Sequence, residues 1–403
     1  MTDQGKESDS RIITNAALLY VAMLAVTLAV IMAVTTIINT NDTYRMLFFL
    51  VLGEALSNAA ILIARLRLSL KLFAVLSILK PLLTLCLGVI LIEAGFGVTG
   101  ALAALGLAAI LAAIIGGIRL RDFKTLSRKR IGAKDIGALL RFGLPLIAAL
   151  SVQSAVKSTD RILLETLMGS DITGLYAAAQ DIPLKLLTLL IGAVHLAVYP
   201  LAVKALDHGG PASCRKQLAR NAALLAGVLC PAVFGIIILA PQLSAVFLGV
   251  PYRGFATVYI GIFALIAAVN MITQYYFILA FNLSRQTRRM VMPFIAAFTI
   301  NAAAGVVLIP VIGAAGAVIG SALAYAVMLA MAVTRARDIF PMPLPLDALV
   351  KILAASAVMS VLALSVQIRS PLLDLGITTL VAGGAYLIAV FVLDPMDIRK
   401  IMI

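Results

Sequence analysis

Charged side chains inside long apolar stretches are the residues of this sequence whose types could do chemistry, because an ionisable group in a membrane usually faces a cavity or a partner. Five of them lie in two successive stretches: Lys157, Asp160, Arg161, Asp181 and Lys185. Lys157 and Arg161 are four residues apart, as are Asp181 and Lys185, so each pair shares one helical face. The five carry a surplus of one positive charge. This surplus predicts a water-filled cationic cavity that could hold an anionic group.

The same charges also have a structural interpretation. Asp160 can pair with Lys157 or Arg161, and Asp181 with Lys185, so that the pairs join two helices without touching a substrate. We therefore assign Asp160 and Asp181 to structural or coupling roles, and the three basic residues to substrate binding.

Lys80 is a fourth basic residue inside an apolar stretch, residues 72–92, and Pro81 directly after it favours a helix kink. Its ammonium group would add positive charge near the middle of the membrane, or it would snorkel to the interface or pair with Glu54. Glu54 is the lone acid of residues 44–64 and is itself a candidate for ion or proton coupling. Lys80 thus joins the predicted substrate ligands, and Glu54 joins the structural or coupling charges.

Other kinds of chemistry are excluded by what the sequence lacks. Its two histidines are scattered, and its three cysteines, Cys86, Cys214 and Cys230, form no metal-binding or disulfide pattern. It contains no Walker A motif, catalytic triad, paired-carboxylate site or glycine-rich phosphate loop. We expect no enzyme, no catalytic residue, no metal and no cofactor. Any driving force must then come from an ion gradient or from consumption of the product.

The elements that must position these charges are membrane-spanning helices. Hydrophobic residues make up 63% of the 403 residues, charged residues make up 12%, and the mean hydropathy is +1.10, which excludes a soluble globular chain. Because a span needs about 20 apolar residues, the sequence predicts an all-α integral membrane protein with about twelve transmembrane helices. The predicted spans are residues 17–38, 44–64, 72–92, 97–118, 143–166, 174–203, 221–248, 255–281, 290–310, 313–334, 348–368 and 371–393.

The formal charge of +14 follows the connectors between these spans. Most of the 32 Lys and Arg residues lie at the termini or in connectors on the same side as the N-terminus, with a dense group in residues 119–141. Among the basic residues in connectors and at span ends, only Arg45, Arg253 and Arg369 fall on the opposite side. This bias predicts that both termini are cytoplasmic. It accounts for the charge without any nucleic acid, and the basic rims would also attract anionic lipid headgroups.

A short internal repeat organises the spans. Residues 88–101, GVILIEAGFGVTGA, match residues 305–317, GVVLIPVIGAAGA, with a one-residue gap, and both stretches end one span and open the next. The offset predicts two pseudo-repeated lobes, of which the first lacks two helices. We expect an N-lobe remnant of four helices with a basic cytoplasmic linker at residues 1–142, a six-helix C-lobe at residues 143–337, and two additional C-terminal helices at residues 338–403.

The segment beginning at Arg141, RFGLPLIAALSVQSAVKSTDRILLETLMGSDITGLYAAAQDIPLKL, resembles a helix hairpin of one transporter family. It is similar to the hairpin of helices seven and eight in the polysaccharide (O-antigen type) flippase branch of the multidrug/oligosaccharidyl-lipid/polysaccharide (MOP) exporter superfamily. The marks that carry the resemblance are Gly143, Pro145, Asp160, Ile162, Leu163, Gly174, Tyr176 and Ala179. The resemblance implies two six-helix lobes around a central cavity and an extra C-terminal pair. This sequence departs from the pattern because the first two N-lobe helices are absent.

The resemblance also implies a function. It indicates a multi-pass flippase of the bacterial inner membrane that moves undecaprenyl-pyrophosphate-linked glycan units for surface polysaccharide biosynthesis. The expected partners are the lipid bilayer, the lipid-linked glycan, and polysaccharide polymerase or assembly proteins. Two alternatives remain open. One is a drug or cation antiporter of the same superfamily, which would need a carboxylate-dominated site. The other is a non-transporting subunit or a degenerate, truncated member.

Overall fold

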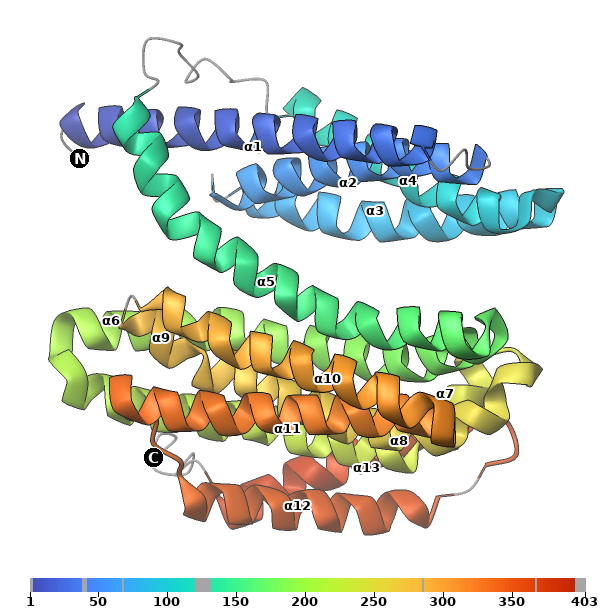
Figure 1. The fold of residues 1–403 in the computed structure, drawn as a ribbon. Coiled ribbons are helices and arrows are strands. Elements are labelled where there is room, and N and C mark those ends of the chain that lie inside the picture. The colour runs from blue at the N-terminus through green and yellow to red at the C-terminus, as the bar shows by residue number, and fades with distance from the viewer. Residues whose placement is uncertain are drawn as a thin grey trace. The chain divides into compact units, whose positions relative to one another are not determined.

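The computed structural model describes residues 3–37, 42–66, 69–119, 132–284, 286–366 and 368–395, and every regular element in these ranges is a helix (Figure 1). The all-α prediction is therefore confirmed for this part of the chain. The chain divides into two compact units, Met1–Arg141 and Phe142–Ile403. The ends of the chain and most of the basic linker after Arg119 lie outside the described residues. The further division expected at residue 337 stays a prediction.

Unit 1 is built from four antiparallel helices. They are α1 (Asp3–Ile37), α2 (Asp42–Leu66), α3 (Leu70–Leu91) and α4 (Gly97–Arg119), with the π-helical turn η1 (Ile92–Phe96) between the last two. Small residues let α2 and α4 approach closely, as is common between helices in membranes. A Cβ atom added to Gly53 would lie 2.9 Å from the carbonyl oxygen of Gly106, and one added to Gly116 would lie 2.6 Å from Cβ of Ala60.

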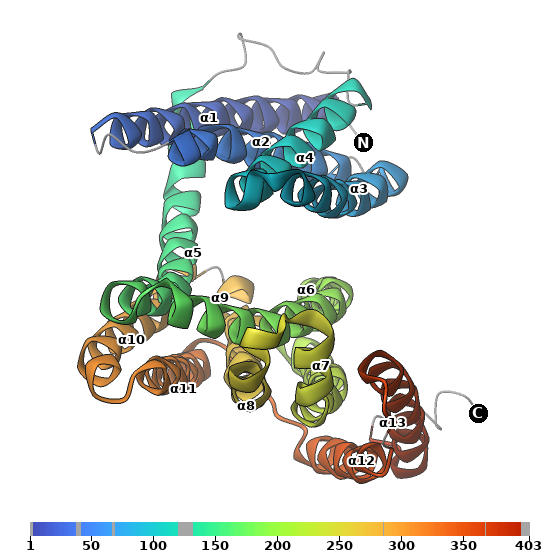
Figure 2. The same cartoon turned by 90° about the vertical axis from the view of Figure 1, so that its right-hand side faces the viewer.

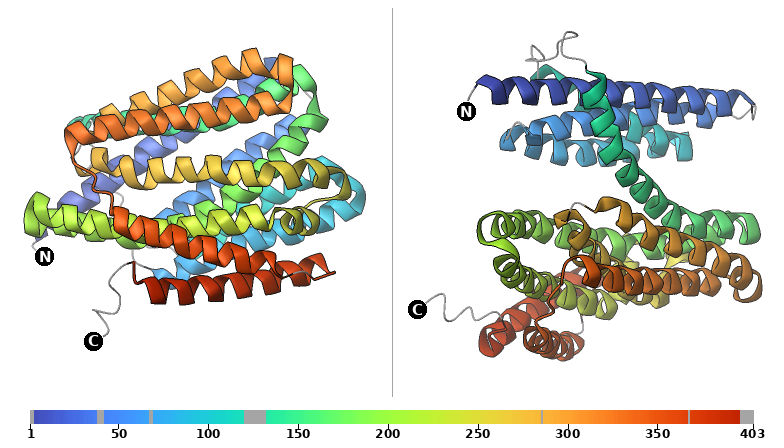
Figure 3. Two further views of the ribbon diagram at one scale, coloured as in Figure 1. Left: turned by 90° about the horizontal axis from the view of Figure 1, so that it is seen from below. Right: turned by 60° about the vertical axis from the view of Figure 1, so that its left-hand side comes forward.

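Unit 2 contains the remaining helices. They are α5 (Ala133–Met168), which begins before the boundary between the units, α6 (Ser170–Ile238), α7 (Ala240–Phe247), α8 (Val250–Ile272), the π-helical turn η4 (Thr273–Phe277), α9 (Leu279–Leu283), the 3-10 turn η5 (Thr287–Met290), α10 (Val291–Ile312), α11 (Ala314–Ile339), α12 (Leu346–Leu364) and α13 (Pro371–Leu393). Helices α10 and α11 run antiparallel along each other (Figure 3). Helices α12 and α13 form a second pair beside α6 and α7 (Figure 2).

Helix α6 consists of two antiparallel segments. The chain reverses at Gly210, whose φ of 67° is a backbone angle that glycine adopts without steric cost, and Pro211 follows directly. Asn221 donates a hydrogen bond through Nδ2 to the carbonyl oxygen of Val198, at 3.1 Å, and ties the two segments together. Helix α6, with its two segments, therefore covers two of the predicted spans.

Nine helical segments among the described residues are long and apolar enough to cross a membrane. Two of them, Lys71–Arg119 and Ser170–Ile238, contain a reversal and each covers two predicted spans. Helix α5 covers the remaining predicted span but is more polar than the others. The predicted span 221–248 is wrong as a single helix, because α6 ends at Ile238 and α7 starts afresh at Ala240. Pro241 in the first turn of α7 lacks the N–H that would continue the ladder.

The two halves of the sequence repeat form the same turn. Gly97 between α3 and α4 has φ 52° and ψ −132°, and Gly313 between α10 and α11 has φ 61° and ψ −141°. Three residues later, a Cβ on Gly100 would meet the carbonyl oxygen of Leu91 at 3.1 Å, and one on Gly316 would meet that of Leu308 at 2.6 Å. Matching residues therefore make matching close contacts.

Candidate functional site

The first group of predicted residues lies where α5 and α6 face each other after the Gly169 turn. Arg161 donates hydrogen bonds through Nη2 to Oδ1 of Asp181, at 2.6 Å, and to Oε1 of Gln180, at 2.9 Å. Nζ of Lys185 lies 3.2 Å from Oδ2 of Asp181. One carboxylate thus holds two cations, one from each helix, and joins α5 to α6.

Two basic residues contact this one accessible carboxylate, and a third, Lys157, lies within electrostatic range of it. The side chain of Lys185 is 77% exposed, whereas those of Arg161 and Asp181 are 35% and 33% exposed. Lys157 makes no hydrogen bond or ion pair within the described residues. Its ammonium group interacts electrostatically with both Asp181 and Arg161. The group therefore has two positive charges in excess.

Asp160 does not belong to this group, although it is adjacent to Arg161 in the sequence. Its side chain is fully buried, and its Oδ2 accepts hydrogen bonds from Tyr176 of α6, at 2.8 Å, and from Ser321 of α11. Asn301 of α10 donates through Nδ2 to the carbonyl oxygen of Val156 one turn earlier, at 2.8 Å. The expected pairing of Asp160 with Lys157 or Arg161 is therefore replaced by a buried polar centre that joins α5, α6, α10 and α11.

The remaining two predicted residues meet each other in unit 1. Nζ of Lys80 on α3 lies 2.6 Å from Oε2 of Glu54 on α2, and Asn58 donates to the same carboxylate oxygen at 3.4 Å. The side chain of Lys80 is only 19% exposed and that of Glu54 is 33% exposed. Of the alternatives open for Lys80, the structure shows pairing with Glu54, so the pair carries no excess charge.

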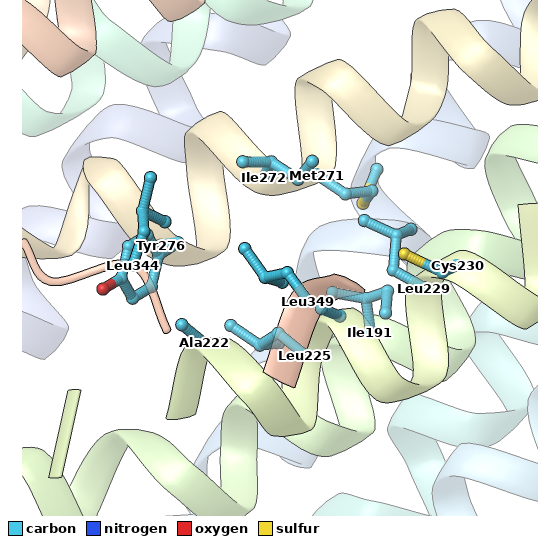
Figure 4. Close-up of a pocket in the computed structure, with 11 residues that line it drawn as sticks. Ile191, Ala222, Leu225, Leu229, Cys230, Met271, Ile272, Tyr276, Leu344 and Leu349 are labelled. Carbon is cyan, nitrogen blue, oxygen red and sulfur yellow. The ribbon is translucent and has the colours of Figure 1, made fainter. Parts of the chain in front are cut away.

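A separate hollow in unit 2 has a different character. It is an apolar cavity of about 140 Å³ between the two segments of α6, the α8 to η4 region and the start of α12 (Figure 4). Its walls include Ile191, Leu229, Cys230, Met271 and Leu349. None of the predicted charged residues lines it, and a dry cavity of this kind would accept only apolar groups.

Several polar residues of the site were not predicted from the sequence. Gln180 binds Arg161, Ser321 binds Asp160, and Asn301 lies beside that carboxylate. The available signals were weak: Gln180 precedes Asp181 directly, and Ser321 lies four residues before Tyr325 on one helical face. Among the described residues no group of three or more His, Cys, Asp or Glu is arranged to hold a metal ion.

Solved structures with the same fold are membrane transporters. The structure described as lipid II flippase MurJ in an inward closed conformation matches 100% of this chain and 86% of its own, with a TM-score of 0.68 and 13% identity. An outward-facing multidrug resistance MATE family transporter of the MOP superfamily matches 82% of this chain and 80% of its own, with a TM-score of 0.61 and 15% identity. A MATE transporter in complex with MaL6 matches 83% and 81%, with a TM-score of 0.62 and 14% identity.

In sequence, no curated protein gives a significant match. A family model described as "Polysaccharide biosynthesis protein" matches residues 3–257, which is more than half of the chain. The resemblance expected from the sequence is thus confirmed at the level of family and fold. The chain belongs to the polysaccharide biosynthesis protein family, and it has the fold of the MOP-superfamily transporters.

Proposed function

We propose that this protein translocates lipid-linked oligosaccharide units across the bacterial inner membrane for the synthesis of a surface polysaccharide of the O-antigen type. The observation that carries the proposal is the group formed by Lys157, Arg161 and Lys185. Arg161 and Lys185 contact one accessible carboxylate, Asp181, and Lys157 adds a third cation within electrostatic range of it, on α5 and the apolar helix α6. Such a group is costly in a membrane unless it faces water or an anion.

The chemistry of the group suits an undecaprenyl-pyrophosphate carrier. Lys185 is exposed and Lys157 makes no ion pair within the described residues, so both ammonium groups can approach a pyrophosphate. Arg161 keeps its position through Gln180 and Asp181, and its guanidinium offers a planar fork of donors to the same anion. The polyprenyl tail would stay in the bilayer while the polar headgroup crosses.

The distribution of basic residues at the rims supports an orientation. Within unit 2, the basic residues Lys204, Arg215, Lys216 and Arg220 flank the Gly210 reversal, at the end of α6 opposite to the Gly169 turn. Positively charged connectors face the cytoplasm in most membrane proteins. We infer that the Gly210 end and both chain termini are cytoplasmic.

A drug or cation antiporter would need carboxylates that are free to bind a cation. Glu54 and Asp181 both carry basic partners, and Asp160 is buried with two hydroxyl donors. The sign of the accessible charge therefore favours an anionic substrate over a cationic drug.

Transport in proteoliposomes tests the proposal. The probe is undecaprenyl pyrophosphate carrying a fluorescent tetrasaccharide, and its exposure to an external quencher reports translocation. We expect the triple variant K157Q/R161Q/K185Q to slow translocation at least about tenfold, because each lost contact to the pyrophosphate is worth about 1 to 3 kcal/mol.

The matched control is Lys216→Gln, which removes one exposed basic residue outside the group. It should translocate at the rate of the unmodified protein. Complementation of a flippase-deficient strain with separate Ala variants of Lys157, Arg161, Lys185 and Lys80 is the cellular counterpart. Normal glycan display by the variants of Lys157, Arg161 and Lys185 would rule out the cationic site, whatever the Lys80 variant does, because Glu54 neutralises Lys80.

A further inference from the structure

The charged group is the start of a longer polar stripe on α6. Residues spaced alternately four and three apart share one face of a helix. From Asp181 onward this spacing selects Asp181, Lys185, Thr188, Gly192, His195 and Tyr199. Every one of them is at least partly exposed, whereas Leu187, Ile191 and Val198 on the adjoining face are buried.

This stripe is distinct from the part of α6 that suits lipid. Leu189, Leu190 and Leu196 are also exposed, at 72%, 42% and 55%, and they form an apolar face. The leucines can contact hydrocarbon, but the stripe cannot without a penalty, because polar groups that face lipid find no hydrogen-bond partner there. An aqueous or polar space suits the exposed polar groups of the stripe better than lipid does.

The far end of the stripe is an aromatic cluster. The rings of His195 and Tyr199 stack with their centroids 5.5 Å apart and their planes at 28°, and Tyr275 lies 5.0 Å from His195 at 55°. Tyr275 reaches α6 from the π-helical turn η4, and its hydroxyl oxygen would lie 3.8 Å from a Cβ on Gly192. Single π-helical turns are rare and often occur at functional sites, because they shift side chains out of the regular helical register.

Three polar atoms of this cluster have no hydrogen-bond partner within the described residues, although the imidazole of His195 also interacts with the backbone of Tyr275. Nδ1 of His195 is buried and makes no hydrogen bond. Within the described residues, the hydroxyl groups of Tyr199 and Tyr275 also make none, whereas Tyr176, Tyr276 and Tyr386 all donate to protein oxygens. A cluster of flat rings with unused donors and acceptors at its edges is suited to a ligand that is apolar on its faces and polar on its rim.

We propose that His195, Tyr199 and Tyr275 form a second subsite that binds a sugar ring of the transported glycan, an inference that rests on the proposed function. The C–H faces of a pyranose pack on aromatic rings, and its hydroxyl groups exchange hydrogen bonds with tyrosine hydroxyls. His195 lies 14 residues after Asp181, about 21 Å along the helix at 1.5 Å per residue. The pyrophosphate and a sugar of the same molecule can therefore occupy the two ends of the stripe.

The absence of tryptophan from the sequence makes a direct test possible. In the variant Tyr275→Trp the new indole is the only tryptophan, and it keeps an aromatic face in the cluster. We expect its emission to shift when undecaprenyl pyrophosphate with a tetrasaccharide is added to the purified protein, and not with the glycan-free lipid. The control is Tyr259→Trp on α8, where the ring stacks on Phe255 instead and should report neither ligand.

Transport of the same two lipids gives the second readout. The double variant Y199L/Y275L should slow the glycan-bearing lipid about tenfold, because two aromatic contacts to the sugar are lost. It should leave the glycan-free lipid within about twofold, whereas K157Q/R161Q/K185Q should slow both.

The outcomes separate this subsite from the proposed function. If the Tyr275→Trp emission does not respond to the glycan, the subsite is refuted, whatever the triple variant does. Equal slowing of both lipids by Y199L/Y275L would also refute it, because loss of helix packing does not discriminate between them. If the triple variant transports normally while Tyr275→Trp responds to the glycan, the sugar subsite stands and the cationic site fails.

Discussion

Hairpins α3–α4 and α10–α11 are the two copies of one sequence repeat, and they differ in what surrounds them. Both turn at a glycine with nearly the same backbone angles, Gly97 and Gly313, and both bring a second glycine against the carbonyl of a leucine. In unit 2 the hairpin also supplies Asn301 and Ser321 to the polar centre at Asp160.

Unit 1 builds its polar contact differently. Its Glu54–Lys80 pair joins α2 and α3 and neutralises itself, with one cation for one carboxylate. In unit 2, Arg161 and Lys185 pair with Asp181, and Lys157 lies within electrostatic range of it. One carboxylate therefore faces three cations, and two positive charges remain in excess. The two copies thus share the turn and the close packing between helices, while the charge that could hold an anion is concentrated in unit 2.

The largest expected effect concerns the glycine contact that the two hairpins share. In Gly316→Ala the new Cβ would lie 2.5 to 2.7 Å from backbone atoms of Leu308 and Ile309, which cannot move without displacing the helix. We expect a loss of about 3 kcal/mol in the free energy of unfolding. Gly100→Ala should cost less, about 1 to 2 kcal/mol, because its nearest contact is the Cβ of Phe96 at 2.8 Å and the Leu91 carbonyl is farther away. Thermal unfolding of the purified variants in detergent measures both losses.

Gly117→Ala is the matched control for this pair. Gly117 lies in α4 with no atom within 4 Å of an added Cβ, so alanine should raise the free energy of unfolding by about 0.5 to 1 kcal/mol. Equal losses at Gly100 and Gly316 would show that the two turns are packed alike and would remove the proposed difference.

Much of the fold follows from the sequence because hydropathy and glycine spacing are local signals. The predicted ends of the spans 97–118 and 371–393 agree with α4 and α13 within a residue. The break after Ile238 was missed because an apolar run continues through Pro241 and conceals it. The extension of both segments of α6 into residues 204–220, up to the reversal at Gly210, was also missed, since those residues are polar and indicate a connector.

The sequence predicted which charged residues belong to the site better than it predicted their hydrogen-bond partners. The i,i+4 spacing placed Asp181 and Lys185 on one face, and their 3.2 Å pair agrees with it. The spacing could not show that Asp160 rotates away from Arg161, because adjacent residues on a helix point about 100° apart and the choice between faces depends on tertiary packing. Ser321, which donates a hydrogen bond to Asp160, is 161 residues away in the chain, so no local pattern could indicate it.

The buried polar centre gives the next largest effect. Ser321→Ala removes a donor from the fully buried Asp160 and should lower the free energy of unfolding by about 2 kcal/mol. Ser57→Ala in unit 1 is its counterpart, because Ser57 is equally buried but donates only to the carbonyl of Glu54 in its own helix. That change should cost less than about 0.5 kcal/mol. If the two serines cost the same, the polar centre does not distinguish unit 2 from unit 1.

Unit 2 also carries the helix pair α12–α13, and Tyr386 tests how it is held. Its hydroxyl donates to the carbonyl oxygen of Gly227 at 2.7 Å, four residues before Pro231. Since proline has no N–H, this carbonyl has no helical partner, and Tyr386 supplies one. Tyr386→Phe should therefore lower the free energy of unfolding by about 1 kcal/mol. In a Pro231→Ala background, where the newly introduced backbone N–H can donate instead, the same change should cost less. An undiminished loss in that double variant would contradict the explanation.

The smallest expected effect on stability is at Lys185. Its side chain is 77% exposed, and Asp181 keeps Arg161 when Lys185 is removed, so Lys185→Gln should change the free energy of unfolding by less than about 0.5 kcal/mol. Lys80→Gln should cost more, because Lys80 is 19% exposed and its loss leaves Glu54 without its cation. Transport should show the opposite order, with Lys185→Gln the more damaging change, if the lysine of unit 2 serves the substrate and that of unit 1 serves the fold. Thermal unfolding and translocation of undecaprenyl pyrophosphate, measured on the same preparations, compare the two lysines. If Lys80→Gln were the more damaging change in both measurements, excess charge in unit 2 would have no functional meaning.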